Sequence, residues 1–240
     1  MRLNWGEVLA EAGVYWRGGA APLVAVASIF FLLPDFAIQL WMPVPDLSAL
    51  EGEAYRLATM AFLRENAVWL AARFVSESMG VGTLLLLLLD PARLSVGEAL
   101  VRALRLLPGL AVARLIAFAG TMLGAMLLFV PGFYIAGRTF ITSATYVCES
   151  QRGPVGATLA GFERTRGNGW KLFMLAFAGW AVSALFGGTV LQMALTAEPL
   201  GQIATGPLRL LAAAIGAGAM LFVVLLEAAA YRALTTNTGM

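Results

Sequence analysis

The sequence predicts an all-α, polytopic integral membrane helix bundle, with about six transmembrane helices and amphipathic interfacial helices, built by residues 1–240 as a single transmembrane domain. Two observations support this prediction. Sixty per cent of the 240 residues are hydrophobic, only 12% are charged, and the mean hydropathy is +0.82. The apolar residues also fall in long runs of about 20, which is the length that a helix needs to cross a bilayer.

Six segments have the length and apolarity of a transmembrane helix. They are residues 20–42, 68–89, 107–130, 133–148, 170–195 and 208–231. The fourth segment is shorter and more polar than the others. Pro131-Gly132 separates it from the third, and we expect the chain to reverse there as a tight helical hairpin, because proline lacks the helical donor and glycine permits unusual dihedral angles. The alternative is one kinked or re-entrant element.

Three stretches share a layout that indicates an internal repeat, in which an amphipathic segment leads directly into a span. These stretches open at Gly6, Gly97 and Gly156. The repeat units would be residues 1–90, 91–150 and 151–240, each with one surface helix and two spans. In the middle unit, Ser95 and Glu98 have the spacing of a capping box, and an apolar stripe lies opposite two arginines. A helix of this kind lies in the plane of the lipid headgroups.

The distribution of basic residues predicts the orientation of the spans. One side of the membrane receives Arg2, Arg17, Arg93, Arg102, Arg105, Arg152, Arg164, Arg166, Lys171 and Arg232, and the other receives Arg56, Arg64 and Arg209. The excess predicts that both termini lie in the cytoplasm, with the chain in a bacterial inner membrane. Residues 43–67 would then face the periplasm. Within them, residues 51–66 are expected to form a surface helix that offers the membrane Tyr55, Met60, Phe62 and Leu63.

The residue types that are missing argue against an enzyme. The sequence has no histidine, which removes imidazole metal sites and nucleophiles activated by histidine. Its single cysteine, Cys148, allows neither an intramolecular disulfide nor a thiolate metal cluster. A phosphate loop, a CxxC pair and a nucleophile elbow are absent from the sequence as well. We therefore expect no enzymatic activity, no cofactor and no metal, and the small net charge of +2 gives no reason to expect nucleic acid as a partner.

Polar residues inside the apolar segments are the candidates for function, because they are costly at membrane depth. Four of them recur in the fourth segment at spacings of three and four residues, which places them on one helical face. They are Arg138, Thr142, Thr145 and Glu149. This stripe predicts either a hydrophilic groove for solutes or lipid headgroups, or interhelical bonds in which Arg138 pairs with Glu149 or Glu227. Arg114, in the third segment, is expected to reach inward headgroups or a carboxylate.

Other charged and small residues indicate packing. Arg73 and Glu77 are four residues apart near the outer end of the second segment, where they form an ion pair or Arg73 extends to the membrane surface. Asp35 follows Pro34 and indicates a break in the first segment, but the sequence shows no base that would pair with it. Small residues at four-residue spacing in the third, fifth and sixth segments predict close approaches between helices.

A pattern of scattered residues extends from the hairpin into the fifth segment. It comprises Pro131-Gly132, Arg138, Glu149, Gly153-Pro154, Thr165-x-Gly167-Asn168-x-Trp170 and Phe173. In this pattern the chain resembles a bacterial family, namely the membrane domain attached to some glycerophosphoryl diester phosphodiesterases and stand-alone inner-membrane relatives of unknown function. It departs from the family at Ala160-Gly161, where the family has an Arg-Ser pair. The resemblance implies a six-span helical architecture and no activity, because the catalytic domain of the diesterase has no counterpart in these 240 residues.

Our leading hypothesis from the sequence is a non-enzymatic inner-membrane protein that acts in envelope maintenance by organising lipids or partner membrane proteins. The alternative is a transporter or lipid-translocating protein with a polar path along the fourth segment, in which Arg138 meets an anionic headgroup or solute. Helix breaks near Pro34 and Pro131 favour that alternative. A membrane-embedded enzyme is the third hypothesis. The expected partners are membrane lipids, with other membrane proteins or further copies of the chain.

Overall fold

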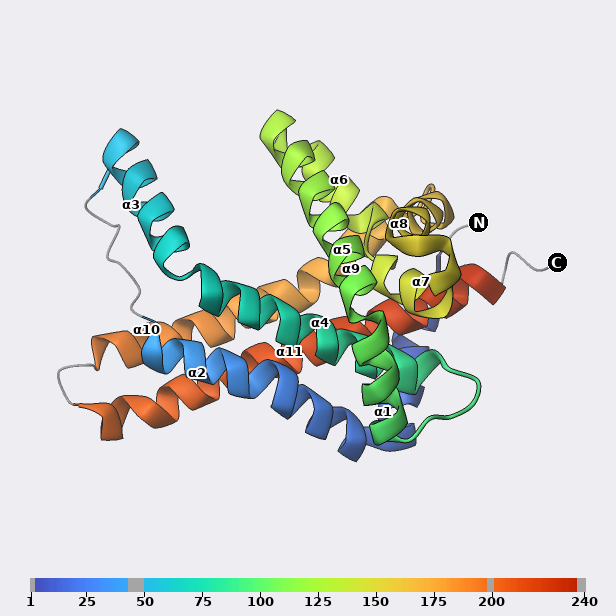
Figure 1. The fold of residues 1–240 in the computed structure, drawn as a ribbon, viewed down its shortest axis with the longest axis horizontal. Helices are drawn as coiled ribbons and strands as arrows, with labels where there is room; N and C mark the ends of the chain where they lie inside the picture. The colour runs from blue at the N-terminus through green and yellow to red at the C-terminus, as the bar shows by residue number, and fades with distance from the viewer. Residues whose placement is uncertain (1–2, 43–49, 198–200, 237–240) are drawn as a thin grey trace.

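The computed structural model describes residues 3–42, 50–197 and 201–236, which form an all-α bundle (Figure 1). Five helical stretches within them are long and apolar enough to cross a membrane. They are Trp5–Trp41, Ala67–Leu89, Val96–Leu127, Gly169–Thr196 and Thr205–Thr236. The predicted fold class is thus confirmed, and the chain is a multi-pass membrane protein. Arg2 and residues 43–49, which enter the predicted orientation, lie outside the described residues.

The first long stretch contains two irregularities. It consists of α1 (Trp5–Ala27), the π-helical η1 (Ser28–Leu32) and α2 (Leu33–Trp41). The backbone leaves helical geometry at Gly19, which separates the predicted amphipathic segment from the first span. Pro34 has no N–H to offer the carbonyl of Phe30, and this carbonyl accepts a hydrogen bond from Ser76 Oγ at 3.0 Å instead. The predicted break is therefore a π-helical segment whose freed carbonyl is bonded by a neighbouring helix.

The next two helices meet at Asn66. They are α3 (Gly52–Glu65) and α4 (Ala67–Leu89). All of α3 is at least partly exposed, including Tyr55, Met60 and Leu63, so the predicted helix is confirmed, whereas its place on the membrane surface stays a prediction. The leucine-rich end of α4 is instead the centre of the protein core, because the side chains of residues 84–86 are almost completely buried.

A helical hairpin follows, formed by α5 (Val96–Leu127) and α6 (Phe129–Arg138). The capping box of Ser95 and Glu98 is confirmed, but the predicted surface helix and third span form one continuous helix. The chain reverses at Leu128 (φ −162°, ψ 142°) rather than at Pro131-Gly132. Pro131 lies in the first turn of α6, where the missing N–H costs no helical bond. Gly132 allows the two helices to touch, since a Cβ there would lie 2.6 Å from Ala125 N.

The prediction of a fourth span over residues 133–148 is wrong. The segment is divided between α6 and the seven-residue α7 (Thr142–Cys148), with turns at residues 139–141. Thr139 leaves helical geometry (φ −95°, ψ 1°), and its hydroxyl donates to the carbonyl of Ile135 at 3.0 Å. Neither piece approaches the ~20 residues that cross a bilayer. Within the described part of the chain, five stretches rather than six have the length and apolarity of a span, and α6 leads the chain back beside α5.

The remaining elements complete the bundle. They are η2 (Ser150–Arg152), α8 (Gly153–Arg164), α9 (Gly169–Val182), the π-helical η3 (Ser183–Gly187), α10 (Gly188–Thr196) and α11 (Gln202–Thr236). In Figure 1, α2 with the part of α1 after Gly19, α4, α9–α10 and α11 run along the long axis, and the α5–α6 hairpin stands at a steep angle to them. Helices α7 and α8 gather at the end that holds both termini, whereas α3 lies near the other end. Leu3 N donates to Asn168 Oδ1 at 2.9 Å, which fixes the amino-terminal end beside α9.

The core lies where α1, α4, α5, α7 and α11 meet. Small residues bring these and neighbouring helices close, as predicted. A Cβ on Gly124 would lie 3.0 Å from Gly132 Cα, and one on Gly179 would lie 2.3 Å from a side-chain atom of Val223. The threefold repeat stays a prediction. Its middle unit has the ten-residue α6 in the place where the other two units have a long helix.

Candidate functional site

The four residues of the predicted polar stripe do not share one helical face, because the helix that would align them is broken. Arg138 is the last residue of α6, Thr142 and Thr145 belong to α7, and Glu149 follows α7. They lie at the end of the bundle that carries both termini, beside α8. The prediction of a continuous groove along a fourth span is therefore wrong, and the side chains of Arg138, Thr145 and Glu149 bond different parts of the protein.

Arg138 joins α6 to the carboxyl-terminal end of α8. Its side chain is buried and its guanidinium donates to the carbonyl of Phe162, from Nε at 3.1 Å and also from Nη2. Nε donates further to Thr165 Oγ1 at 3.1 Å and Nη1 to Tyr134 Oη at 3.2 Å, and the guanidinium carbon lies 3.9 Å from the centre of the Phe162 ring. A cation at this position bonds carbonyls that the helix leaves without partners. The interhelical hypothesis for Arg138 is confirmed, with a carbonyl in place of the predicted carboxylate.

The two threonines face the protein interior. Thr145 Oγ1 donates to the carbonyl of Ile141 at 2.9 Å, within its own helix. Thr142 Oγ1 is buried, and no described residue bonds it. Glu227, which the sequence offered as a partner for Arg138, instead accepts a hydrogen bond from Ala144 N at 2.8 Å near the start of α7. A carboxylate is favourable there because the first N–H groups of a helix lack helical partners.

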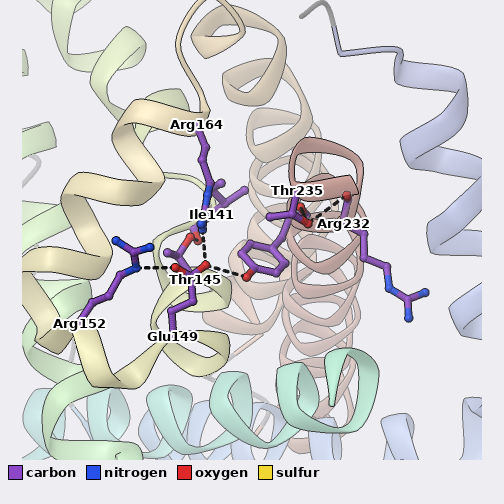
Figure 2. Close-up of polar contacts among 8 residues, drawn as sticks. Ile141, Thr145, Glu149, Arg152, Arg164, Arg232 and Thr235 are labelled. Carbon is purple, nitrogen blue, oxygen red and sulfur yellow. Dashed lines mark hydrogen bonds and ion pairs between the residues drawn. The ribbon is translucent and has the colours of Figure 1, made fainter. Parts of the chain in front are cut away.

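Glu149 is the centre of a polar cluster that ties α7 to α8 and α11. Figure 2 shows Arg152 and Arg164 reaching Glu149 from two directions. Arg152 Nε donates to Glu149 Oε2 at 2.6 Å, and Oε1 accepts from Arg164 Nη1 and from Tyr231 Oη at 3.0 Å. Burial of the carboxyl group raises its pKa, but the hydrogen bonds from Arg164 and Tyr231 outweigh it, so that the pKa of Glu149 lies below its ordinary value. The cluster therefore joins the end of α7 to α8 and α11 through ion pairs and hydrogen bonds.

Arg114 belongs to a second polar network, inside the bundle. Its Nη1 donates to Ser78 Oγ at 3.1 Å, and its Nη2 lies 3.8 Å from Glu77 Oε2. Glu77 accepts from Arg73 Nε at 2.9 Å, so the predicted ion pair within α4 is confirmed. Of the two predicted destinations for Arg114, a headgroup or a carboxylate, the structure shows the carboxylate.

The same network contains a basic partner for Asp35, which the sequence did not reveal. Arg73 Nη2 lies 3.0 Å from Asp35 Oδ1. The two residues lie on α2 and α4, which the fold places side by side. An alternating chain of charges, Asp35, Arg73, Glu77 and Arg114, therefore crosses from α2 through α4 to α5. Charges inside an apolar bundle are expensive unless paired, and here each has a partner of opposite sign.

A cavity of ≈ 940 Å³ opens onto this network between α2, α10 and α11. Asp35, Gln39, Arg73 and Arg209 contribute its polar lining, and Ile38, Leu191 and Leu195 are among its apolar lining residues. A neighbouring cavity of ≈ 310 Å³ shares Asp35 and Arg73 with it and reaches Glu77. A mostly apolar cavity with a few convergent polar groups is the usual form of a ligand site.

Two of the helical stretches that flank the cavity contain a π-helical segment, η1 before α2 and η3 before α10. Segments of this kind occur often at functional sites. Two features of the sequence lie in this region, namely Asp35 after Pro34 and the charged residues Arg73 and Glu77 in an apolar segment. The sequence could not show that α2, α10 and α11 surround a common space. Among the described residues, no group of three or more Cys, Asp or Glu side chains gathers as a ligand set for a metal ion.

No protein-family model, no curated protein and no solved structure matches the chain. The structure therefore defines the class of the protein, a multi-pass α-helical membrane protein with a charged cavity at one end and an arginine-rich cluster of short helices at the other. The resemblance to the diesterase membrane domain stays a prediction.

Proposed function

We propose that this protein binds a lipid in the cavity between α2, α10 and α11, and that it acts without catalysis in the maintenance of the bacterial envelope by organising lipids of the inner membrane. The observation that supports the proposal is the composition of the cavity wall. Charged groups from three helices line it together with aliphatic side chains of α2 and α10. This combination matches an amphiphile, which has a charged headgroup and apolar chains.

The position of the cavity in the bundle also favours a lipid. The polar lining includes Asp35, about two turns from the end of α2 at Trp41, and Arg209, about two turns from the start of α11. A headgroup at this level stays close to the depth at which headgroups normally lie. The cavity has the size of a small-molecule site, since such sites enclose about 300–1,000 Å³.

The proposed orientation, with both termini in the cytoplasm, is supported by the charges that the fold gathers at one end. Lys171 Nζ donates to the carbonyl of Leu3 at 2.6 Å, and Arg232 pairs with Glu11 at 3.0 Å, so basic residues of α9 and α11 lie beside the amino-terminal helix. Arg152 and Arg164 belong to the same end. An excess of arginine and lysine is typical of the cytoplasmic side. The cavity then belongs to the periplasmic half of the protein.

The proposal can be tested with detergent-purified protein by native mass spectrometry. The wild type is expected to retain phospholipid through delipidation. Arg73→Gln is expected to lose most of it, because the substitution removes a charged group from the lining of the cavity. Arg56→Gln on the exposed helix α3 is the matched control and should retain lipid as the wild type does. Lipid retention that is equal in Arg73→Gln and the wild type would refute the site, provided that both proteins elute as folded species.

The alternative function, lipid translocation, is favoured by a different observation. The charge network does not stop at the cavity but continues through Glu77 to Arg114 on α5, and two of the flanking helical stretches have π-helical segments. A scramblase assay in liposomes with fluorescent phospholipid tests it. Translocation by the wild type that is lost in Arg73→Gln would establish the alternative, and no translocation by the wild type would exclude it.

A further inference from the structure

We propose that an apolar groove between α1 and α11 binds a second phospholipid, with one acyl chain in the groove and the phosphate at Arg17. This groove is separate from the cavity of the proposed function, which lies between α2, α10 and α11. It has a volume of ≈ 550 Å³, and none of the described residues that line it is charged.

The groove exists because α1 bends at Gly19 and α11 packs against it on both sides of the bend. Trp16 lines the groove from before the bend and Val24 from after it. Both side chains are exposed, so the groove is open to the surroundings of the bundle. On α11 the lining includes Gly218, where a Cβ would meet nothing within 4 Å. An empty groove would lose dispersion contacts, so another molecule is expected to fill this space.

The length of the groove matches one leaflet of a bilayer. On α11 its lining extends from Ala214 to Leu225, 11 positions apart, which is ~16 Å at the rise of an α-helix. The hydrocarbon core of a bilayer is ~30 Å thick, so each leaflet contributes ~15 Å. An acyl chain of a single leaflet therefore fits along the groove.

Arg17 provides a positive charge at the rim of the groove. Its Nη2 would lie 3.6 Å from a Cβ on Gly13, which is one of the lining residues. The side chain of Arg17 is exposed, and none of the described residues forms a hydrogen bond or an ion pair with it. Guanidinium binds phosphate through two parallel N–H donors, so this group is available for the headgroup of a lipid in the groove.

The neighbours of Arg17 place it at the depth of the headgroups. It lies just before the bend at Gly19, where the amphipathic segment meets the first span. Trp16 is exposed beside it, and tryptophan is enriched where a bilayer meets water. The proposed orientation assigns this junction to the cytoplasmic side, so the bound lipid belongs to the cytoplasmic leaflet.

A phospholipid fits these features better than a helix from a second copy of the chain. A helix is a straight rod about 10 Å wide, whereas the wall of this groove bends at Gly19. A flexible acyl chain can follow the bend and fill the space over Gly218. The apolar surface of a transmembrane helix would also offer Arg17 no anion.

The experiment is photocrosslinking of the purified protein in detergent with an equimolar phosphatidylglycerol that carries a diazirine in one acyl chain, followed by peptide mapping. Adducts are expected on α1 and on residues 214–225 of α11. Gly218→Leu should remove most of them, because the new side chain occupies the open space. Gly206→Leu is the matched control, since this position of α11 is also open but lies outside the groove. Adducts spread evenly over all helices, or unchanged adducts in folded Gly218→Leu, would overturn the proposal.

Arg17 provides the second test, with unlabelled phosphatidylglycerol as the competitor. Arg17→Gln should lower the affinity of the groove about fivefold, which corresponds to one basic residue beside a lipid headgroup. Arg17→Lys keeps the charge and should stay within about twofold of the wild type. Arg166→Gln, at an exposed position outside the groove, should bind as the wild type does. Diacylglycerol with the same acyl chains should compete about fivefold less well than phosphatidylglycerol, and equal competition would refute the phosphate contact.

Two further measurements separate this site from other occupants and from the proposed function. Arg73→Gln, which lies in the other cavity, should keep the adducts on α1 and α11 whether or not it loses lipid from that cavity. Loss of these adducts in Arg73→Gln would show that the groove is not an independent site. A dimer in detergent that dissociates in Gly218→Leu would show that a second copy fills the groove, and it would overturn the proposal.

Discussion

The Glu149 cluster leads to a quantitative prediction about stability. Glu149→Gln preserves the shape of the side chain and removes its charge. The amide oxygen can still accept from Arg164 and Tyr231, but both bonds lose their charge assistance, at about 1 kcal/mol each. The amide nitrogen would also face Arg152 Nε, donor against donor, where the wild type has a bond of 2.6 Å. Because Arg152 is half exposed, this loss is small. The free energy of unfolding should therefore fall by about 2–3 kcal/mol.

The assay is thermal or denaturant unfolding in detergent, followed by circular dichroism. Glu163→Gln is the control, because Glu163 lies on α8 at an exposed position. It should unfold within about 0.5 kcal/mol of the wild type. An unchanged free energy of unfolding in Glu149→Gln would refute the stabilising role of the cluster, since its contacts would then make no net contribution to stability.

The dependence on pH follows from the same group. The pKa of Glu149 is lower in the folded protein than its ordinary value. Its contribution to the free energy of unfolding is therefore complete above the ordinary pKa and is lost as the pH falls through the lowered pKa of the folded protein. Acidification below pH ~4.5 should reduce the stability of the wild type. The Glu149→Gln protein should lose less over that interval, and an equal loss in both proteins would show that other carboxylates dominate.

Two further predictions concern the α5–α6 hairpin, one at the end of α6 and one at the contact between its two helices. Arg138→Leu should destabilise the protein by about 3 kcal/mol, because it removes the bonds of the guanidinium to the Phe162 carbonyl, Thr165 Oγ1 and Tyr134 Oη, and Arg105→Leu at an exposed site should change stability little. Gly132→Val should lower stability by about 1–3 kcal/mol or more through contact with backbone atoms of α5, whereas Gly218→Val, where a Cβ meets nothing within 4 Å, should not. Unfolding in detergent measures both, and a variant as stable as its control would contradict the corresponding contact.

The parts of the fold that depend on neighbouring residues were predictable from the sequence. The apolar runs indicated the long helices, and Ser95 with Glu98 fixed the start of α5 to the residue. The amphipathic pattern of residues 51–66 predicted the helix α3. Each of these features is decided within a few residues, by capping bonds or by the side of the helix that lipid or protein covers.

The break in the fourth predicted span was not predictable, because its cause lies outside the segment. Averaged hydropathy treats residues 133–148 as one apolar stretch, but Arg138 is directed to the end of α8 by a bond to residue 162. The pairing of Asp35 with Arg73 has the same origin, since 38 positions separate them and only the packing of α2 on α4 brings them to 3.0 Å. Spacing rules describe residues on one helix, and both functional networks of this protein join different helices.

The two networks divide the sequence-predicted candidates into two roles. Arg138 and Glu149 bond neighbouring helices at the arginine-rich end, whereas the hydroxyl of Thr145 bonds within its own helix. Arg114 connects instead to the charges that reach the cavity. Loss of activity on replacing Arg138 would therefore report a loosened hairpin as readily as a lost ligand. Substitutions at Arg73 and Gln39 separate these effects, because both residues line the cavity and neither belongs to the cluster that ties α7 to α8.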